Sequence, residues 1–298
     1  MSVISDYKTS PFDVFVQPPL TSNYTGTATP PGPGYTPTVV SYGGNSTYDY
    51  SYDSLCGVRF NTNDGRQVVM VRNGGTEISA LAISAGQVVQ GPAEITTWNH
   101  LAMTVPTATP ATAGTYQILV TNAGTKLNAG EYNNGYLLVD TGSSTQFGQT
   151  LQIASHPAAA ASATFIVTLQ DPIQVTLDAN CFVSLIRNKH IGVVVGATGL
   201  TGAAVGASFY AIGAGTASTY DGTSGAQTAQ GQPVYAFVGC HGIWGVRADA
   251  STAAVGLPLS ASTSTAGDCT VFTAAKQLIG NAASSGTSTR SQAVDFLL

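Results

Sequence analysis

The sequence predicts an all-β protein whose short antiparallel strands form one or two barrel-like or sandwich-like units, preceded by an extended N-terminal arm. Three observations lead to this fold class. Short runs of β-branched and aromatic residues alternate with polar residues along most of the chain. The runs are bounded by Gly, Pro or Asn, which favour turns between strands. The alanine-rich stretch HPAAAASAT (156–164) is limited by proline and β-branched neighbours to about a turn or two of helix.

Residues 1–56 form the predicted arm, which is rich in Tyr, Pro and Gly. Four prolines between positions 30 and 37 restrict φ and remove backbone donors, so we expect no isolated core here. Disordered linkers are poor in aromatic residues, whereas tyrosine combines a large apolar face with a polar tip. We therefore expect the arm to lie on a partner molecule, with packing on the chain's own body as the alternative. The predicted partner-binding residues are Tyr24, Tyr35, Tyr42, Tyr48, Tyr50 and Tyr52.

Residues 57–180 form a first predicted β-rich domain. The stretch VRFNTNDGRQVVMVRNGG begins it with two strands joined at Asp64-Gly65, because that dipeptide adopts the positive φ angles of a tight hairpin. Further strands are predicted in LAISAGQVVQGPAEI, HLAMTV, GTYQILVTN and GYLLVDTG. Tyr116, Ile118 and Val120 are expected on one face of their strand, which is the alternation of an antiparallel sheet with one buried side.

The strongest strand signal lies in QTLQIASHP, ATFIVTLQDPIQVTLD and CFVSLIRN. Pro172 interrupts this run and predicts an edge or a bend between two strands. Residues 181–298 form the second predicted β-rich region, in which two apolar strands flank a flexible loop at about 213–232. Strands resume in VYAFVGCHGIWGVRAD and CTVFTAA, and the chain ends on the strand QAVDFLL.

The composition argues against an enzyme and against a nucleic-acid-binding protein. Charged residues make up 8% of the chain, the net charge is -5, and the ten Lys and Arg residues are scattered. An acid–base pair is disfavoured because Glu77, Glu94 and Glu131 are the three glutamates in the chain. A Ser-His-Asp site assembled from distant segments is the remaining alternative. We therefore predict no catalysis, no small-molecule substrate and no nucleic-acid partner.

No metal site or cofactor is predicted either. The four cysteines, Cys56, Cys181, Cys240 and Cys269, are widely spaced and are expected to be reduced and mostly buried. Cys240 and His241 are neighbours on one strand, so their side chains point to opposite faces and do not chelate one ion. In the arm, the carboxylates Asp49 and Asp53 could offer oxygens to calcium, but solvated carboxylates are the favoured interpretation.

Two features bear on localisation. The start MSVISDYKTS lacks a basic region followed by an apolar run, which predicts no secretory signal and synthesis in a cytoplasm. No segment approaches the roughly 20 consecutive apolar residues of a membrane-spanning helix. A membrane partner is therefore not expected.

Six segments of the sequence carry a resemblance to a known family: PFDVFVQPPLTSNYTGTATPPGPGYTPTVVSYGGNSTYDYSYDS, GRQVVMVRNGG, VQGPAEI, VPTATPATAGTYQILVT, GQTLQIASHP and VTLQDPIQVTLDA. They resemble the capsid decoration, or cement, proteins of tailed bacteriophages. The C-terminal end is similar to the close of small cement proteins, in which a glycine-turn hairpin leads to an IG-x-A phrase and a final apolar strand. Gly256, Gly267, Gly280 and Ala282 stand at those positions here.

This resemblance implies a virion structural protein that is made in the host cytoplasm and binds the outer capsid surface. It implies a homotrimer that bridges neighbouring major capsid protein subunits at local threefold positions. The chain is longer than the small cement proteins and adds the arm, which weakens a direct transfer of their symmetry. The alternatives are a tail-associated or host-recognition β protein that binds surface glycans, and a polysaccharide hydrolase, which the shortage of glutamates disfavours.

Overall fold

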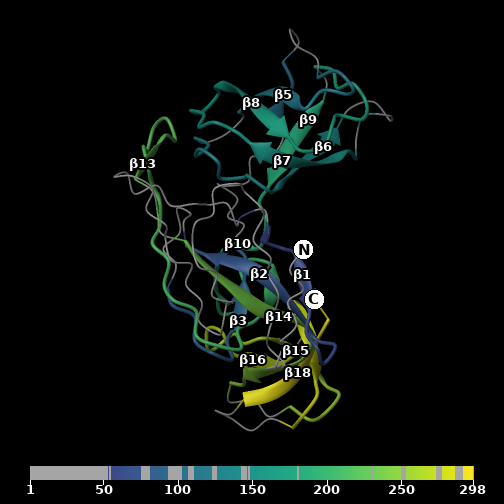
Figure 1. Cartoon of the computed structure of the whole chain (residues 1–298), viewed down its shortest axis with the longest axis vertical. Coiled ribbons are helices and arrows are strands. Elements are labelled where there is room, and N and C mark those ends of the chain that lie inside the picture. The colour runs from purple at the N-terminus through teal and green to yellow at the C-terminus, as the bar shows by residue number, and fades with distance from the viewer. Residues whose placement is uncertain are drawn as a thin grey trace, which may run out of the picture.

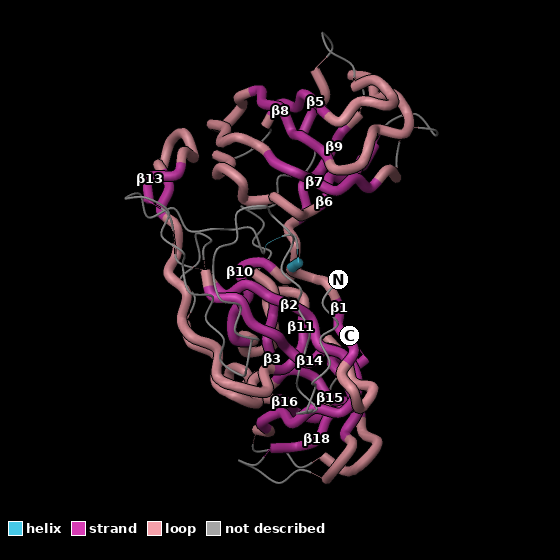
Figure 2. The backbone as a smooth tube through the Cα atoms, in the orientation of Figure 1, coloured by secondary structure: helices cyan, strands magenta, loops and turns pink. Residues whose placement is uncertain are grey.

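The computed structural model describes residues 53, 55–74, 81–92, 103–106, 111–122, 126–141, 146, 148–179, 181–229, 231, 233–249, 253–272, 277–285 and 291–297. These residues contain no α-helix, and their strands form two barrel-like units (Figure 1, Figure 2), which confirms the predicted all-β class. The six tyrosines predicted as partner-binding residues lie outside the described residues. The structure therefore leaves the arm and its role as predictions.

The strands follow one another along the chain with these bounds: β1 Arg59–Asn61, β2 Gln67–Asn73, β3 Val88–Gln90, β4 Met103–Thr104, β5 Gln117–Thr121, β6 Tyr136–Thr141, β7 Thr150–Ser155, β8 Thr164–Leu169, β9 Phe182–Ile186, β10 Ile191–Val195, β11 Ala204–Ala207, β12 Thr219–Tyr220, β13 Gln227–Ala229, β14 Val234–Arg247, β15 Pro258–Ala261, β16 Cys269–Val271, β17 Leu278–Ala282 and β18 Ser291–Leu297. The predicted hairpin at Asp64-Gly65 is confirmed, since β1 and β2 pair antiparallel and Gly65 has a φ of 84°. Pro172 lies beyond the end of β8, as its predicted bend requires.

Strands β4 to β9 form a closed barrel in the order β4-β5-β8-β7-β6-β9, here called the barrel. All its pairings are antiparallel. Alternate residues point inward, and Ile118, Leu137, Ile153 and Val167 belong to one buried cluster. The predicted alternation is confirmed for Ile118 and Val120, whereas Tyr116, which precedes β5, is exposed.

Strands β1 to β3, β10, β11 and β14 to β18 form the second unit, here called the main unit. A ring closes within it, because β2, β10, β3, β11 and β14 pair in turn and β14 returns to β2. The β2–β10 pairing is parallel, which departs from the all-antiparallel arrangement that we predicted. Strand β14 is shared: its first half pairs with β2 and its second half with β18, which leads on to β17, β15 and β16.

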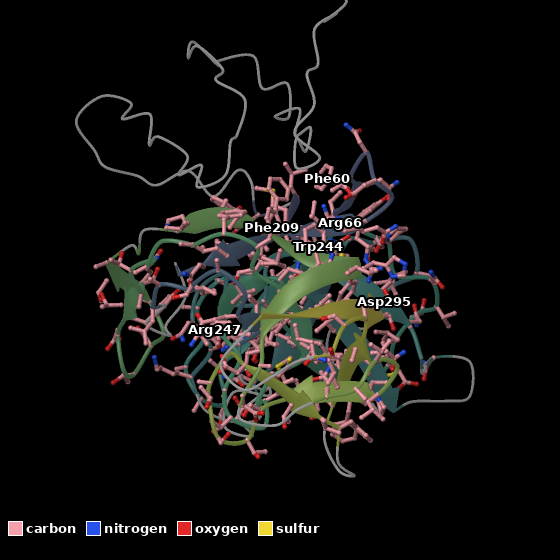
Figure 3. All side chains as sticks on the ribbon, turned by 90° about the horizontal axis from the view of Figure 1, so that it is seen from below. Phe60, Arg66, Phe209, Trp244, Arg247 and Asp295 are labelled. Carbon is pink, nitrogen blue, oxygen red and sulfur yellow. The ribbon has the colours of Figure 1, made fainter. Side chains whose placement is uncertain are left out.

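The middle of β14 is built around Trp244, which is 1% exposed. A Cβ on Gly239 would lie 2.3 Å from the indole ring, so only glycine leaves room for it. The indole Nε1 donates to the carbonyl of His241 at 2.9 Å, and the ring of Phe209 stacks at a centroid distance of 5.0 Å. The Arg66 guanidinium lies 4.1 Å from the indole centroid (Figure 3). Trp244 thereby links β14, the β1–β2 hairpin and the segment after β11.

The strand pairing divides the chain differently from the predicted regions 57–180 and 181–298. Strands β1 to β3 pair with later strands of the main unit, and the barrel is inserted between β3 and β10. In Figure 1 the barrel lies at the top and the main unit below it. Strand patterning does not encode which distant strands pair, so this insertion could not be predicted from it.

The predicted boundary of the arm at residue 56 also needs correction. Cys56 is 6% exposed and packs in a cluster with Met70, Ile191 and Tyr235. The Gly57 amide donates to the carbonyl of Met70 at 2.9 Å. Residues 55 and 56 thus belong to the main unit, because they cover an apolar edge of its sheet.

The predicted flexible loop at 213–232 contains an ordered hairpin instead. Strands β12 and β13 pair antiparallel, and the hydroxyls of Thr219 and Thr228 lie 3.0 Å apart across them. The hairpin reaches the barrel, where the Ala129 amide donates to the carbonyl of Gly225 at 3.2 Å. Figure 1 shows β13 beside the barrel. The segment whose glycine and threonine content predicted a loop is therefore an ordered hairpin that connects the two units.

Candidate functional site

A cavity of about 310 Å³ lies where the barrel, the main unit and the β12–β13 hairpin meet. It is here called the junction cavity. Polar and charged side chains dominate its lining, and they come from segments that are far apart in the sequence. The lining residues are Asp53, Arg72, Pro92, Asn128, Ala129, Gly130, Glu131, Asn133, His156, Arg187, Asn188, Ile191, Tyr220 and Gln227.

One ion pair lines the cavity from the main unit. The Asp53 carboxylate contacts the Arg72 guanidinium, and the two side chains are 13% and 7% exposed. The Tyr235 hydroxyl donates to the other Asp53 oxygen at 2.7 Å. Burial, together with the nearby Asp53 charge, raises the pKa of Tyr235 above its usual range. The prediction that Asp53 is solvated is therefore wrong: its carboxylate fixes the start of the main unit.

A second ion pair lines the cavity from the barrel side. The Arg187 guanidinium, just after β9, contacts the carboxylate of Glu131, and each side chain is 8% exposed. The same Glu131 carboxylate accepts from the backbone N–H of Asn128 at 3.2 Å. Arg187 also lies over the ring of Tyr132, 5.4 Å from its centroid. These contacts fix the loop between residues 126 and 135 against the end of β9.

His156 completes the barrel side of the cavity in its neutral form. Its Nε2 accepts from the Tyr132 amide at 2.9 Å, so this nitrogen carries no proton. Its Nδ1 lies 2.9 Å from the carbonyl of Pro157 and therefore donates to it. Because both ring nitrogens are engaged, His156 has a structural role in this loop rather than the role of a general base.

The outer surface of the barrel carries an uncharged face. It is formed by β4, β5 and β8, whose sequences MT, QILVT and TFIVTL contain no charged residue. Leu119 and Ile166 are cross-strand neighbours, and Ile166 is 45% exposed. Thr104, Thr121 and Thr164 form a row across the three strands, and the last two hydroxyls lie 3.3 Å apart. This surface is called the β4–β5–β8 face below.

A shallow depression marks one end of the β4–β5–β8 face. Its lining residues are Ala111, Thr112, Thr115, Tyr116, Gln117, Leu119, Ile166 and Thr168. Tyr116 is 51% exposed at its rim. Exposed apolar side chains that gather on one uncharged surface indicate a contact site for another macromolecule.

The predictions about cysteine are confirmed. Cys56, Cys181, Cys240 and Cys269 are all free and buried. Burial raises the pKa of the Cys269 thiol to about 12, which keeps it in the unreactive thiol form. Cys240 is buried and the neighbouring His241 is exposed, as the alternation of a strand requires. Within the described ranges, no three His, Cys, Asp or Glu side chains are grouped to hold a metal ion.

Sequence reasoning identified neither the junction cavity nor the β4–β5–β8 face as a site. The cavity unites residues separated by more than a hundred positions, such as Arg72 and Arg187. The sequence indicates the face weakly, through the strand segments MT, QILVT and TFIVTL, which contain no charged residue. No described helix has the length and apolar character to cross a bilayer. Comparisons with protein-family models, with curated proteins and with solved structures found no match.

Proposed function

We propose that this chain is a structural protein of a virus particle that decorates the outer surface of a capsid shell and stabilises it. The β4–β5–β8 face is the observation that carries this proposal. It offers Tyr116, Leu119 and Ile166 to a partner without any charge that would have to be desolvated on binding. The resemblance of the sequence to the capsid decoration proteins of tailed bacteriophages supplies the identity of the partner.

In this proposal the partner is the major capsid protein, and the chain acts as a homotrimer that bridges neighbouring subunits. The protein is made in the host cytoplasm and ends on the outside of the virion. The barrel is suited to this role because its fold is closed by its own strands, so one face can bind the shell without rearrangement of its core. The arm tyrosines add contact area to the same partner, and the function is mechanical rather than catalytic.

A tail-associated protein that recognises host glycans is the second candidate function. The polar lining of the junction cavity favours it, since amide and charged side chains are the groups that bind sugar hydroxyls. Location separates the two candidates, because a decoration protein covers the head and a recognition protein sits on the tail.

The proposal is tested by sedimentation of undecorated capsids with the purified chain and its variants. Replacing Ile166 with Asp places a charge at the centre of the β4–β5–β8 face and is expected to weaken binding about tenfold or more. Leu278→Asp is the matched control, because Leu278 is 42% exposed on β17 of the main unit. It should bind as the unmodified chain does.

Equal sedimentation of all three proteins would exclude the β4–β5–β8 face as the binding surface. The arm is tested separately by removal of residues 1–52, which leaves Asp53 in place, and by joint replacement of Tyr48, Tyr50 and Tyr52 with Ser. Both changes should lower occupancy and make the particles less resistant to heat. An unchanged occupancy would assign capsid binding to the barrel alone.

A further inference from the structure

We infer that the junction cavity binds a small neutral sugar, a monosaccharide or a disaccharide. This inference rests on the polar lining that also favours the second candidate function, and it does not depend on capsid binding. Its basis is the meeting of three segments: the barrel loop with Asn128 and Asn133, the end of β9 with Arg187, and the β12–β13 hairpin with Tyr220 and Gln227.

The size of the cavity suits a ligand of this class. Small-molecule sites occupy roughly 300 to 1,000 Å³, and the junction cavity has about 310 Å³. Such sites also favour the boundary between two domains, where side chains from both converge. The barrel and the main unit supply those two domains here, and the hairpin contact between Ala129 and Gly225 holds them together.

The charges of the cavity favour an uncharged ligand. Its two acids and two bases form the pairs Asp53–Arg72 and Glu131–Arg187, so their formal charges cancel. His156 is neutral because its Nε2 accepts a backbone hydrogen bond. Among the lining residues, a charged ligand would find no uncompensated charge of opposite sign, and it would lose its hydration on entry. The Lys126 ammonium lies beside the lining, where it donates to Asn128 Oδ1 at 2.8 Å and interacts electrostatically with Asp221. A polyhydroxy ligand loses less hydration free energy on entry, because each of its hydroxyls can both donate and accept a hydrogen bond in the cavity.

The polar groups of the cavity include a position for a hydroxyl donor. The Oδ1 atom of Asn133 is buried and has no hydrogen-bond partner among the described residues. Buried amide oxygens in native proteins are almost always hydrogen-bonded, so this atom requires a donor from a bound molecule or water. Asn128 and Gln227 belong to the same lining, and carboxylate and guanidinium groups complete it. The Asn128 Oδ1 accepts from Lys126 at 2.8 Å and the Gln227 Nε2 donates to Ser218 at 3.1 Å, which holds both amides in place. Such a mixture matches the closely spaced hydroxyls of a sugar.

Tyr220 supplies the aromatic surface of the site. It stands at the end of β12 and lines the cavity, and the Lys126 ammonium lies over its ring, 5.9 Å from the centroid. The negative face of an aromatic ring attracts the weakly positive C–H groups on the apolar side of a sugar ring. The hairpin therefore serves a second purpose: it carries the stacking residue to the cavity from the main unit.

The inference is tested by titrating the full chain with glucose, galactose and N-acetylglucosamine, observed by saturation-transfer NMR. At least one of these neutral sugars should bind with a millimolar dissociation constant, and glucuronate should bind more weakly. Tyr220→Ala and Asn133→Ala should each weaken binding about tenfold. Tyr220→Phe keeps the ring and should bind close to the unmodified chain.

Tyr116→Ala is the control, because this exposed tyrosine lies on the β4–β5–β8 face and not in the cavity. It should leave sugar binding unchanged. Circular dichroism and thermal unfolding confirm that each variant is folded before it is titrated. The inference is overturned if none of the neutral sugars gives a saturation-transfer signal, or if folded Tyr220→Ala and Asn133→Ala variants bind as the unmodified chain does. Capsid sedimentation of the same variants should be unaffected, so the two proposals fail independently.

Discussion

The barrel and the main unit reach a closed β architecture in two different ways. The barrel uses neighbouring segments between residues 103 and 186, antiparallel pairs and one buried cluster. The main unit joins strands from both ends of the described chain, includes a parallel pair and divides its buried residues among three clusters. The barrel is thus built from one stretch of the chain, whereas the main unit depends on partners from both ends of the described chain.

The largest difference between the two units is expected from loss of the ion pair that fixes the start of the main unit. Asp53→Ala leaves the Arg72 guanidinium buried without its carboxylate, so the unfolding free energy should fall by about 3 to 5 kcal/mol. Hydrogen exchange read by mass spectrometry should show faster exchange in β2 and β14 and no change in the barrel.

The double variant Asp53→Ala, Arg72→Met is the control for this prediction. It removes both charges and should be less destabilised than the single variant, because no buried charge is left alone. A single variant within about 1 kcal/mol of the unmodified chain would show that residue 53 is not part of the main unit.

A core truncation in the barrel should give the complementary result. Leu137 is 0% exposed in the barrel cluster, so Leu137→Ala should cost about 2 to 5 kcal/mol. Faster hydrogen exchange in the Leu137→Ala variant should be confined to strands β4 to β9. Ile166→Ala, on the outer face of the same barrel, should change stability by less than about 0.5 kcal/mol. If Leu137→Ala loosened the main unit equally, the two units would unfold as one.

Two glycines of β14 test the packing described around Trp244. Gly239→Ala forces a methyl group into the Trp244 ring and should cost about 1 to 3 kcal/mol. Gly245→Ala, on the same strand, meets no atom within 4 Å and should be neutral or slightly stabilising. Chemical denaturation of both variants measures the difference, and equal stabilities would contradict the packing described for Trp244.

The main unit should also show a dependence of its stability on pH. Burial, with further contributions from Lys189 and Arg59, lowers the pKa of His190 to about 4. As the pH falls, His190 therefore binds a proton near pH 6.5 in the unfolded chain but only near pH 4 in the folded chain. Stability should be full above pH 6.5 and decline as the pH falls toward 4. His190→Gln should flatten this part of the profile, and an unchanged slope would assign it to other groups.

Local features of the fold were predictable from the sequence, and long-range ones were not. The Asp64-Gly65 turn and the opposite orientation of Cys240 and His241 follow from dipeptide conformation and strand alternation, and both are confirmed. The contact between Asp53 and Tyr235 joins residues 182 positions apart, which no local pattern reports. The insertion of the barrel between β3 and β10 escaped prediction for the same reason.

The candidate sites were less predictable than the fold. The arm tyrosines, chosen from composition, lie outside the described residues, so their role stays a prediction. The junction cavity needs Asn133 and Tyr220 to meet across a domain boundary, and neither residue stands in a recognisable motif. The β12–β13 hairpin, which carries Tyr220, was predicted as a loop because glycine and threonine are common in turns as well as in short, exposed hairpins.

Electron cryomicroscopy of capsids incubated with the purified chain tests the central claim most directly. We expect density for the barrel on the outer shell at local threefold positions, with the β4–β5–β8 face, and Ile166 at its centre, turned toward the major capsid protein. Density restricted to the tail, or a barrel on the shell with that face exposed to solvent, would show that the chain does not bind the capsid in this way.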